Sequence, residues 1–331
     1  MANVAIVQDD YDAKDPLSTL KLVTKPIPKP APGQVVVHII LRPVNPTDLI
    51  TLRTGAIANG GVAGSEGYGI VYEVGEGVTK LHKGQRVIPF TAEGSQSGTG
   101  SFQKYVCIDA HFVWPVPDYI SDEVAAQFVI NPWTSYSLLK DLQVPKGQYM
   151  IQSAAGSVLG RQVISLAKHW GIKSINVVRR SEQKAELKAL GADEVIVSSE
   201  EDIVARAKEI TGGKGAYGAL DPVCGTTTGT LASCVRNGGQ IFVYGVLSGF
   251  SATVSVVDLF RDVSVTGWGL YTKATNDPKK CLALATEVAP LVRDGIIPVA
   301  EVEKYDLTDF KKAMVKADEP ARSVRVLLVS A

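Results

Sequence analysis

The sequence predicts an α/β protein in which a doubly wound parallel sheet accompanies a second, mainly antiparallel β domain. Residues 1 to about 120 contain short β-branched or apolar runs separated by Gly and Pro, which is typical of strands joined by turns. From about 124 onward, apolar runs alternate with segments of helical periodicity, which is typical of a parallel sheet with helices on both faces. The last run, VRVLLVS (324–330), is expected to rejoin the first domain, because chain ends often lie close together. The predicted domains are 1–123 with 272–331, and 124–271.

In the first domain, three runs predict strands, namely VVVHIIL (35–41), GYGIVYEVG (67–75) and QRVIPF (85–90). The stretch that follows them, TAEGSQSGTGSF (91–102), is polar and rich in Gly and Ser. This composition predicts a mobile loop, and a loop of about a dozen residues is a candidate lid.

In the second domain, strands and helices alternate along the chain. QYMIQSA (148–154) and SINVV (174–178) predict the first two strands, and 155–171 and 181–191 predict the helices that follow them. EVIVS, YGALDPV and QIFVYG predict further strands, with helices near 201–210 and 226–236 between them. A long helix over 277–293 precedes the final strand.

The composition argues against several classes of partner. Lys plus Arg and Asp plus Glu number 34 each among 331 residues, so the formal charge gives no attraction to nucleic acid or to an anionic membrane. No apolar run approaches the ~20 residues of a membrane span. The start, MANVAIVQDDYDAKD, does not resemble a leader, so we expect a cytoplasmic protein. Four cysteines without a C-x-x-C pair predict reduced, mostly buried thiols.

The segment from Met150 to Gly160 predicts a phosphate-binding turn between a strand and a helix. Backbone N–H groups at a helix N-terminus attract a pyrophosphate, and small residues allow it to approach closely. Ala155, Gly156, Ser157 and Val158 are therefore candidate cofactor-binding residues. A strict G-x-G-x-x-G is absent, so an ordinary strand–helix turn remains an alternative.

The end of the second strand indicates which dinucleotide the turn would hold. NAD-binding sites usually place Asp or Glu there, on the ribose hydroxyl. Arg179 and Arg180 occupy this position, with Lys184 just after them. Cationic side chains suit a 2′-phosphate, because Arg grips phosphate through a planar fork. The sequence therefore favours NADPH over NADH, and a solvated, charged helix start is the alternative.

These motifs resemble the medium-chain dehydrogenase/reductase superfamily over essentially the whole chain, and its zinc-free quinone oxidoreductase and enoyl-thioester reductase branches in particular. The resemblance implies a Rossmann cofactor domain for 124–271 and a catalytic domain for the remainder. It is carried by VNPTD (44–48), GSEGYGIVYEVGEGV (64–78), INPWTSYSLL (130–139), QSAAGSVLGRQVISLAKHWG (152–171), NVVRR (176–180), DPVCG (221–225), VYG (243–245) and GWGL (267–270).

Residue types settle the expectation about zinc. The zinc alcohol dehydrogenases of the superfamily bind the catalytic metal through a Cys and a Gly-His-Glu motif, and here Asn45 and Ser65 stand at the Cys and His positions. Only Glu66 remains, and one carboxylate cannot complete a tetrahedral N/S site. The four histidines are scattered singly. We therefore predict no metal site.

The resemblance also implies roles for residues outside the phosphate turn. Asn45 and Thr134 match positions beside the nicotinamide ribose and ring, and are the candidate catalytic residues. For Trp268, core packing is an equal alternative, and Cys224 is expected to be a packed thiol rather than a nucleophile. The further implied cofactor contacts are Val223, Cys224, Gly245, Val246, Leu247, Trp268 and Arg325.

One departure from the family pattern favours the quinone oxidoreductase branch over the enoyl-thioester reductase branch. Enoyl-thioester reductases of this type carry a Tyr shortly after N-P-x-D as the proton donor, whereas LRTGAIANGG (52–61) contains none. A reduced quinone oxygen needs no protein acid, because it can take its proton from water. The sequence therefore favours an NADPH-dependent, zinc-independent reductase of quinones or activated enones. An enoyl-CoA or enoyl-ACP reductase, and a non-catalytic NADPH-binding sensor, are the alternatives.

The resemblance further implies a homodimer formed at an edge of the cofactor-domain sheet. The run FSATVSVV (250–257) is the segment that we expect at this edge, although its alternating apolar residues would equally suit an internal position.

Overall fold

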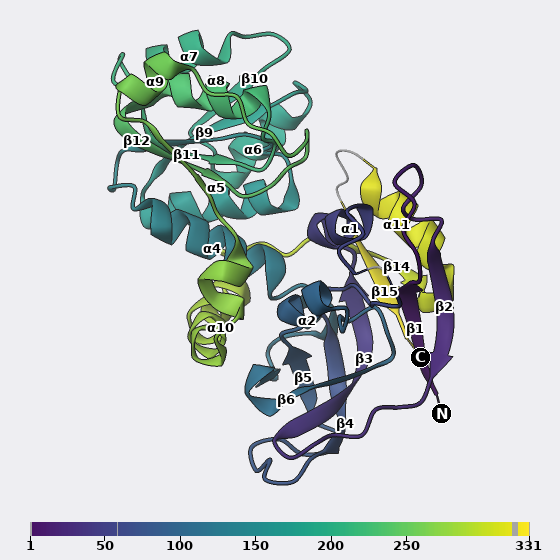
Figure 1. Ribbon diagram of the computed structural model, residues 1–331. Coiled ribbons are helices and arrows are strands. Elements are labelled where there is room, and N and C mark those ends of the chain that lie inside the picture. Colours follow the sequence, from purple (N-terminus) through teal and green to yellow (C-terminus); the bar gives the residue numbers. More distant parts are fainter. Residues whose placement is uncertain (1, 58, 320–323, 331) are drawn as a thin grey trace. The chain divides into compact units, whose positions relative to one another are not determined.

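The computed structural model describes residues 2–57, 59–319 and 324–330, and the chain divides into two compact units (Figure 1). Unit 1 comprises Met1–Ile130, Ala274–Arg293 and Val299–Ala331, and unit 2 comprises Asn131–Lys273 and Asp294–Pro298. The functional domains drawn above at 1–123 with 272–331 and at 124–271 stay a prediction.

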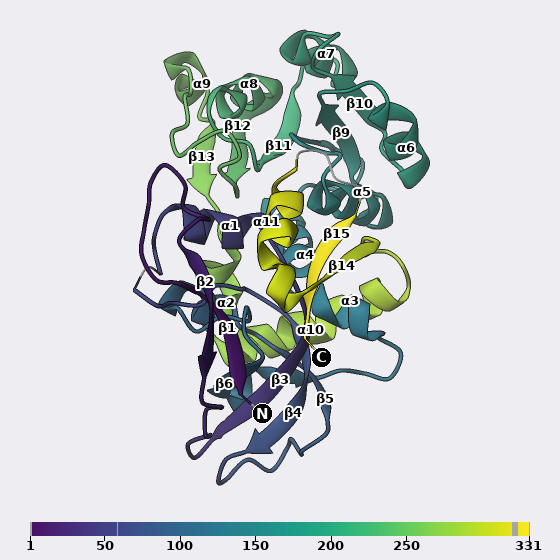
Figure 2. The same cartoon turned by 90° about the vertical axis from the view of Figure 1, so that its right-hand side faces the viewer.

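Unit 2 contains a six-stranded sheet in the order β10-β9-β8-β11-β12-β13, and every neighbouring pair is parallel. Figure 2 shows these strands side by side, from β13 to β10. The predicted doubly wound parallel sheet is therefore confirmed. The strands are β8 (Tyr149–Gln152), β9 (Lys173–Val178), β10 (Glu194–Val197), β11 (Ala216–Asp221), β12 (Val235–Val243) and β13 (Ser264–Gly267).

The helices of unit 2 begin and end where their residues dictate. In α5, Ser157 caps the N-terminus by accepting a hydrogen bond from the Gly160 N–H, and Gly171 ends the helix in the left-handed conformation. Val163, Ile164 and Leu166 bury its apolar face. The helices are α4 (Ile130–Leu142), α5 (Val158–Trp170), α6 (Gln183–Leu190), α7 (Ile203–Ile210), α8 (Thr226–Cys234) and α9 (Val256–Phe260), with a π-helical turn at Tyr271–Thr275.

Unit 1 contains a seven-stranded, mainly antiparallel sheet and a separate β1–β2 hairpin. The last strand, β15, pairs antiparallel with β3 and parallel with β14, so the predicted return of the chain end to the first domain is confirmed. The strands are β1 (Asn3–Gln8), β2 (Leu20–Lys25), β3 (Gln34–Pro43), β4 (Tyr68–Val74), β5 (Arg86–Pro89), β6 (Tyr105–Asp109), β7 (Val113–Pro115), β14 (Val302–Asp306) and β15 (Arg325–Val329).

Short helices accompany this sheet. The predicted long helix over 277–293 is confirmed as α10. The helices are α1 (Pro46–Arg53), α2 (Ala92–Ser97), α3 (Asp122–Ala126), α10 (Pro278–Arg293) and α11 (Phe310–Asp318), with single turns at Ala110–Phe112 and Leu307–Asp309. In the part of the chain that the structure describes, no helix is long and apolar enough to span a bilayer.

Two local predictions were wrong. The stretch 91–102, expected to be a mobile loop, instead forms α2 and a buried return in which Ser101 and Phe102 are fully covered. The run 250–257 forms no strand, because only Ala252 makes an isolated bridge, to Gly225, and α9 begins at Val256. The edge strand beside β12 is instead β13, which pairs with β12 alone among the described strands, and β10 forms the opposite edge. In the first segment tertiary contacts outweigh local composition, whereas residues 250–257 are almost all exposed.

Candidate functional site

The turn after β8 has the geometry that a dinucleotide phosphate site requires. Ala154 adopts a positive φ of 47°, and the Ala155 N–H donates to the Val177 carbonyl at 3.1 Å. A β-carbon at Gly160 would lie 2.6 Å from the Ala155 carbonyl oxygen, so glycine permits the close contact between helix and turn. The turn therefore presents the N-terminus of α5, a helix of 13 residues, to any anion bound there.

The other predicted cofactor residues follow neighbouring strands of the same sheet. The strand order reverses between β8 and β11, and ligands of open parallel sheets bind outside the carboxyl ends at such a point. Arg179 and Arg180 follow β9, Cys224 follows β11, and the segment 245–247 follows β12. Unit 2 thus brings the predicted phosphate turn, the two arginines and two further loops to one edge of its sheet.

The three candidate 2′-phosphate cations are exposed. Arg179, Arg180 and Lys184 all lie at the surface, just before and within the first turn of α6. Within the described part of the chain, no ion pair engages any of these three side chains. Their charge is therefore available to an anion that the turn would hold.

A buried carboxylate that the sequence analysis missed fixes the loop after β11. Asp221 is fully buried and accepts hydrogen bonds from Ser153 Oγ and Thr228 Oγ1, each at 2.7 Å. It also accepts from the N–H groups of Val223, at 2.9 Å, and Cys224, at 3.3 Å. Asp221 thus ties the phosphate turn to the predicted adenosine loop. An acidic residue that ends an apolar run, as in YGALD, is the signal that would have found it.

The loop after β12 packs against the loop after β11. The Leu247 N–H donates to the Pro222 carbonyl at 3.1 Å, and a β-carbon at Gly245 would lie 2.6 Å from the same oxygen. Gly245 and Val246 are half-buried, whereas the Leu247 side chain is exposed. The predicted contact of these three residues with the nicotinamide stays a prediction.

The remaining predicted contacts of unit 2 are buried. Trp268 donates from Nε1 to Asp141 Oδ2 at 2.8 Å, which agrees with the packing alternative given above. Cys224 is buried as expected, and Thr134 lies buried in α4. The two other buried thiols are Cys234 and Cys281, and burial raises the pKa of Cys234 to about 12.

In unit 1, Asn45 lies at the centre of a buried polar cluster. Its backbone N–H donates to Asp48 Oδ2 at 2.8 Å, which closes a capping box at the start of α1. Its Nδ2 donates to Glu66 Oε1 at 3.1 Å, and its Oδ1 accepts from Arg325 Nη2. We call Asn45, Asp48, Ser65, Glu66 and Arg325 the Asn45 cluster. The sequence motifs did not identify the capping function of Asp48, although the N-x-x-D spacing is typical of a capping box.

The charged side chains of the Asn45 cluster have hydrogen-bond or ionic partners, but they are buried away from water. Glu66 Oε2 accepts from the N–H groups of Val129 and Ile130, each at 2.9 Å, and Glu66 Oε1 lies 3.6 Å from Arg325 Nη2. Burial raises the pKa values of Glu66 and Asp48, and Arg325 opposes both shifts. Burial likewise lowers the pKa of Arg325. Among the described residues, the buried Nε of Arg325 has no hydrogen-bond partner. The predicted contact between Arg325 and a cofactor stays a prediction.

The Asn45 cluster does not suit a zinc ion. Asn45 and Ser65 offer neither thiolate nor imidazole, and the Ser65 hydroxyl is bound to Asp48 Oδ1. No group of three or more His, Cys, Asp or Glu among the described residues is placed to hold a metal. The donor types in this cluster therefore differ from those of a catalytic zinc site.

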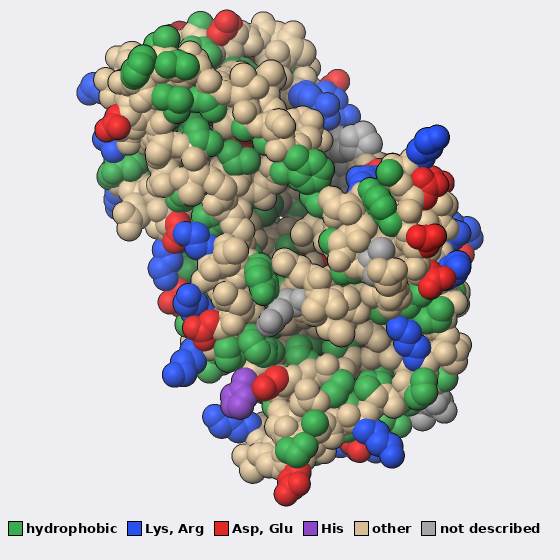
Figure 3. All heavy atoms as spheres, in the orientation of Figure 1, with side chains coloured by type: hydrophobic (Ala, Val, Ile, Leu, Met, Phe, Trp, Pro, Cys, Tyr) green, Lys and Arg blue, Asp and Glu red, His purple; other side chains and the backbone are tan. Residues whose placement is uncertain are grey.

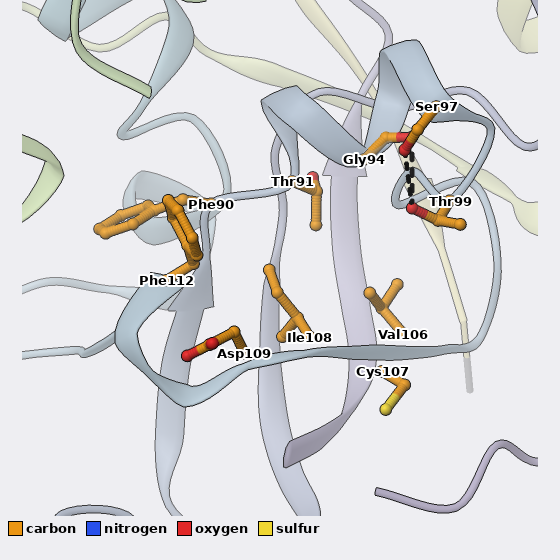
Figure 4. A pocket seen from close by; sticks show the side chains of 10 residues that line it. All are labelled: Phe90, Thr91, Gly94, Ser97, Thr99, Val106, Cys107, Ile108, Asp109 and Phe112. Atoms are coloured by element: carbon orange, nitrogen blue, oxygen red, sulfur yellow. Dashed lines mark hydrogen bonds between the residues drawn. The ribbon is translucent and has the colours of Figure 1, made fainter. Parts of the chain in front are cut away.

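A cavity of about 210 Å³ lies between α2 and β6 in unit 1 (Figure 4). Val106 and Ile108 point from β6 toward α2, and Phe90 and Phe112 lie together at one end. Ser97 and Thr99 share a hydrogen bond of 3.3 Å. The walls are thus mostly apolar, with hydroxyl groups at one side.

The cavity and the Asn45 cluster share one helix, because Ser95 Oγ, also on α2, lies 3.5 Å from Ser65 Oγ. The lining residues are Phe90, Thr91, Gly94, Ser97, Thr99, Val106, Cys107, Ile108, Asp109 and Phe112.

Comparison with known proteins gives consistent family matches for both parts of the chain. The model of the alcohol dehydrogenase GroES-like domain matches residues 31–118, and that of the zinc-binding dehydrogenase domain matches residues 158–287. A mitochondrial enoyl-[acyl-carrier-protein] reductase of Caenorhabditis elegans is 34% identical, over 93% of this chain and 90% of the relative. The relative of the same name from Dictyostelium discoideum is 31% identical, over 89% and 85%.

Solved structures include a second kind of relative. Escherichia coli quinone oxidoreductase complexed with NADPH has a TM-score of 0.87 and 27% identity, and all of each chain is covered. This chain therefore shares its fold with a quinone oxidoreductase and its greater sequence identity with enoyl reductases.

The expectation of a cytoplasmic protein is corrected by these relatives. Those from C. elegans, D. discoideum and Arabidopsis thaliana are all named as mitochondrial, which contradicts that expectation. The expectation rested on the composition of the first residues alone.

Proposed function

Because the chain belongs to the medium-chain dehydrogenase/reductase superfamily and is an oxidoreductase, we propose that it is an NADPH-dependent reductase of conjugated carbonyl compounds. The observation that carries this proposal is the set of exposed cations Arg179, Arg180 and Lys184 beside the phosphate turn. An NADPH complex among the structural relatives supports a nicotinamide cofactor.

The residues of unit 2 that would hold the cofactor divide by chemistry. The α5 N-terminus at Gly156 and Ser157 would bind the pyrophosphate, and the cations would bind the 2′-phosphate. Asp221 would hold the adenosine loop in place through its bonds to Val223 and Cys224. NADPH supplies a hydride when bound, so the protein's own task is positioning and charge stabilisation.

The Asn45 cluster would stabilise charge on the acceptor. Hydride addition to a conjugated carbonyl places negative charge on its oxygen, and fixed donors aimed at that oxygen lower the barrier. Asn45 keeps one Nδ2 hydrogen after its bond to Glu66, and Arg325 keeps its Nε hydrogen. We propose Asn45 as the donor and Arg325 and Glu66 as the residues that orient its carboxamide. The cavity under α2 would take an apolar part of the acceptor.

Quinones and activated enones are the first candidate acceptors, because they can take their proton from water. Enoyl thioesters are the second candidate, and the names of the curated relatives favour them. The structure adds one observation in their favour. Tyr11 donates from its hydroxyl to the Arg53 carbonyl at 2.9 Å and lies against Gly55, so a phenol from another part of the chain reaches the segment that lacks the family Tyr.

The test is a steady-state comparison of NADPH and NADH with a panel of quinones, enones and enoyl thioesters. We expect the triple variant R179A/R180A/K184A to raise KM for NADPH at least tenfold, because about 1.4 kcal/mol of lost binding is a factor of ten. Neutralising Lys214, another exposed cation of unit 2, is the matched control. Turnover of no acceptor by wild-type protein that binds NADPH tightly would instead identify a non-catalytic NADPH-binding protein. An unchanged preference between the coenzymes in the triple variant would refute the proposed phosphate site.

We also propose that the protein associates with a second copy of itself. An exposed apolar patch, formed by Phe250, Val256, Val257, Leu259 and Phe260, includes most of α9, and Figure 3 shows hydrophobic side chains gathered over this part of unit 2. Along the chain it adjoins the edge strand β13, whose free side can pair with the same strand of another copy. Patches of this kind usually mark contacts between proteins.

A further inference from the structure

A side-chain bridge joins the phosphate turn to α6. Arg161, in the first turn of α5, donates from Nε to the Gly156 carbonyl at 3.0 Å. The other side of its guanidinium forms a two-bond ion pair with Glu186, of which the Nη2–Oε2 bond measures 2.9 Å. One side chain therefore contacts both the turn and α6, the helix beside the three cations proposed to bind the 2′-phosphate.

Gln183 makes the second contact between these two segments. A β-carbon at Gly156 would collide with the Gln183 side-chain amide, so that amide lies directly on the turn. Gln183 is the first residue of α6, and Glu186 lies one turn further along. The N-terminal end of α6 is thus held against the turn at two points. Leu187, fully buried against Ile164 and Val178, fixes the same helix from its apolar face.

The position of α6 decides where its neighbouring cations can reach. Arg179 and Arg180 immediately precede α6 and Lys184 lies within it, and their long side chains are exposed. A pyrophosphate at Gly156 and a 2′-phosphate at these cations belong to one ligand, so the distance between the two sites must match that ligand. A small displacement of a binding group lowers its contribution steeply.

We propose that Arg161 and Glu186 are positioning residues that set the preference for NADPH over NADH. Their bridge keeps the cations beside α6 at the spacing from the phosphate turn that a 2′-phosphorylated dinucleotide requires. The bridge has a second effect, because Glu186 would repel a 2′-phosphate if its carboxylate were unpaired. Arg161 balances that charge and lowers the pKa of Glu186 by hydrogen bonding to it. The inference rests on the proposed NADPH-binding function.

An ordinary surface ion pair is the competing explanation. Such pairs contribute little to stability, and removing one should affect both coenzymes alike. The side chains of Arg161 and Glu186 are 24% and 57% exposed, so either variant should fold. The measurement that separates the two explanations is the ratio of kcat/KM for NADPH to kcat/KM for NADH.

The experiment compares E186Q, R161M and the double variant E186Q/R161M with the wild type. We expect each single variant to lower this ratio at least fivefold through a higher KM for NADPH, and the double variant to lower it no further than R161M alone, because both act through one bridge. R161K keeps the charge but lacks the planar fork, and should fall between wild type and R161M. The matched control is R206M, which removes the ion pairs of Arg206 to Glu209 within α7 and to Glu194 and Glu201.

Equal increases in KM for the two coenzymes, or an unchanged ratio in all three variants, would overturn the inference while leaving the proposed function intact. A wild-type enzyme without preference for NADPH would instead refute the proposed coenzyme, and the inference with it.

Discussion

The side chains of Glu66 and Arg325 are both buried, and Glu66 Oε1 lies 3.6 Å from Arg325 Nη2. Each charge therefore offsets part of the free-energy cost of burying the other. Residues separated by 259 positions meet here, so no local pattern could pair them. Asn45, Ser65 and Glu66 could be found from the sequence, because each belongs to a short continuous motif. They assigned Arg325 to a cofactor, whereas the structure also gives it partners inside unit 1. Contacts between distant residues are what sequence patterns omit.

Replacing Arg325 by Met should make the stability of the protein strongly dependent on pH. Arg325 opposes the burial that raises the pKa of Glu66, so its loss should raise that pKa further. Between the ordinary carboxyl pKa of about 4.3 and the higher folded value, the folded state then binds the additional proton, so stability falls as pH rises. We expect R325M to lose about 3–5 kcal/mol at pH 8, the usual cost of breaking a buried pair, and clearly less at pH 5.

Urea unfolding of wild type and R325M at both pH values measures this difference. E66Q/R325M is the control, since it removes the Glu66 carboxyl and leaves only Asp48 to titrate, so its loss should differ less between pH 5 and pH 8 than that of R325M. If R325M itself loses equal stability at both values, Glu66 does not carry the buried charge that we assign to it.

At the scale of elements, the contact between α5 and the phosphate turn depends on one glycine. Gly160→Ala would place a β-carbon 2.6 Å from the Ala155 carbonyl oxygen. Alanine is the better helix former by about 1 kcal/mol, but overpacking of a tight contact costs about 1–3 kcal/mol. We therefore expect a small net loss of stability together with weaker NADPH binding, because the α5 N-terminus must move away from the turn.

Nicotinamide fluorescence titration and urea unfolding check both expectations for G160A. Gly269→Ala is the matched control, since its β-carbon would meet nothing closer than Thr272 Oγ1 at 3.6 Å. NADPH affinity equal to that of wild type in G160A would show that the close contact is unnecessary for the turn.

The elements themselves could largely be predicted, and the exceptions have physical causes. β3, β4 and β9 contain β-branched runs long enough to predict strands without tertiary information. α2 could not be predicted, because AEGSQS is a poor helix former whose fold depends on buried contacts such as Ser95 to Ser65. The Arg161–Glu186 bridge was equally invisible, since its partners stand 25 positions apart on two helices.

At the scale of the whole molecule, the charge balance and the surface indicate different partners. Because the formal charge is zero at pH 7, we expect association with another protein to be driven by apolar surface rather than by overall electrostatic attraction. Unit 2 exposes such a surface on α9, where Phe260 is 87% exposed. Among the described strands, β13 is also an edge strand of its sheet, and natural proteins rarely leave an edge uncovered.

Phe260→Glu should therefore convert a dimer of two 35.2 kDa chains into a monomer. A two-fold contact doubles every substitution, so each interface would bury two added carboxylates in an apolar environment, and unpaired charges there are strongly unfavourable. Size-exclusion chromatography with light scattering measures the mass directly. Val315→Glu is the control, because Val315 is 64% exposed on α11 of unit 1, and that variant should keep the mass of the wild type. A monomeric wild type, or a dimeric F260E, would show that α9 does not form the contact between copies. If F260E is monomeric but still turns over NADPH, each chain holds a complete reductase, and the second copy serves to cover the apolar surface of α9.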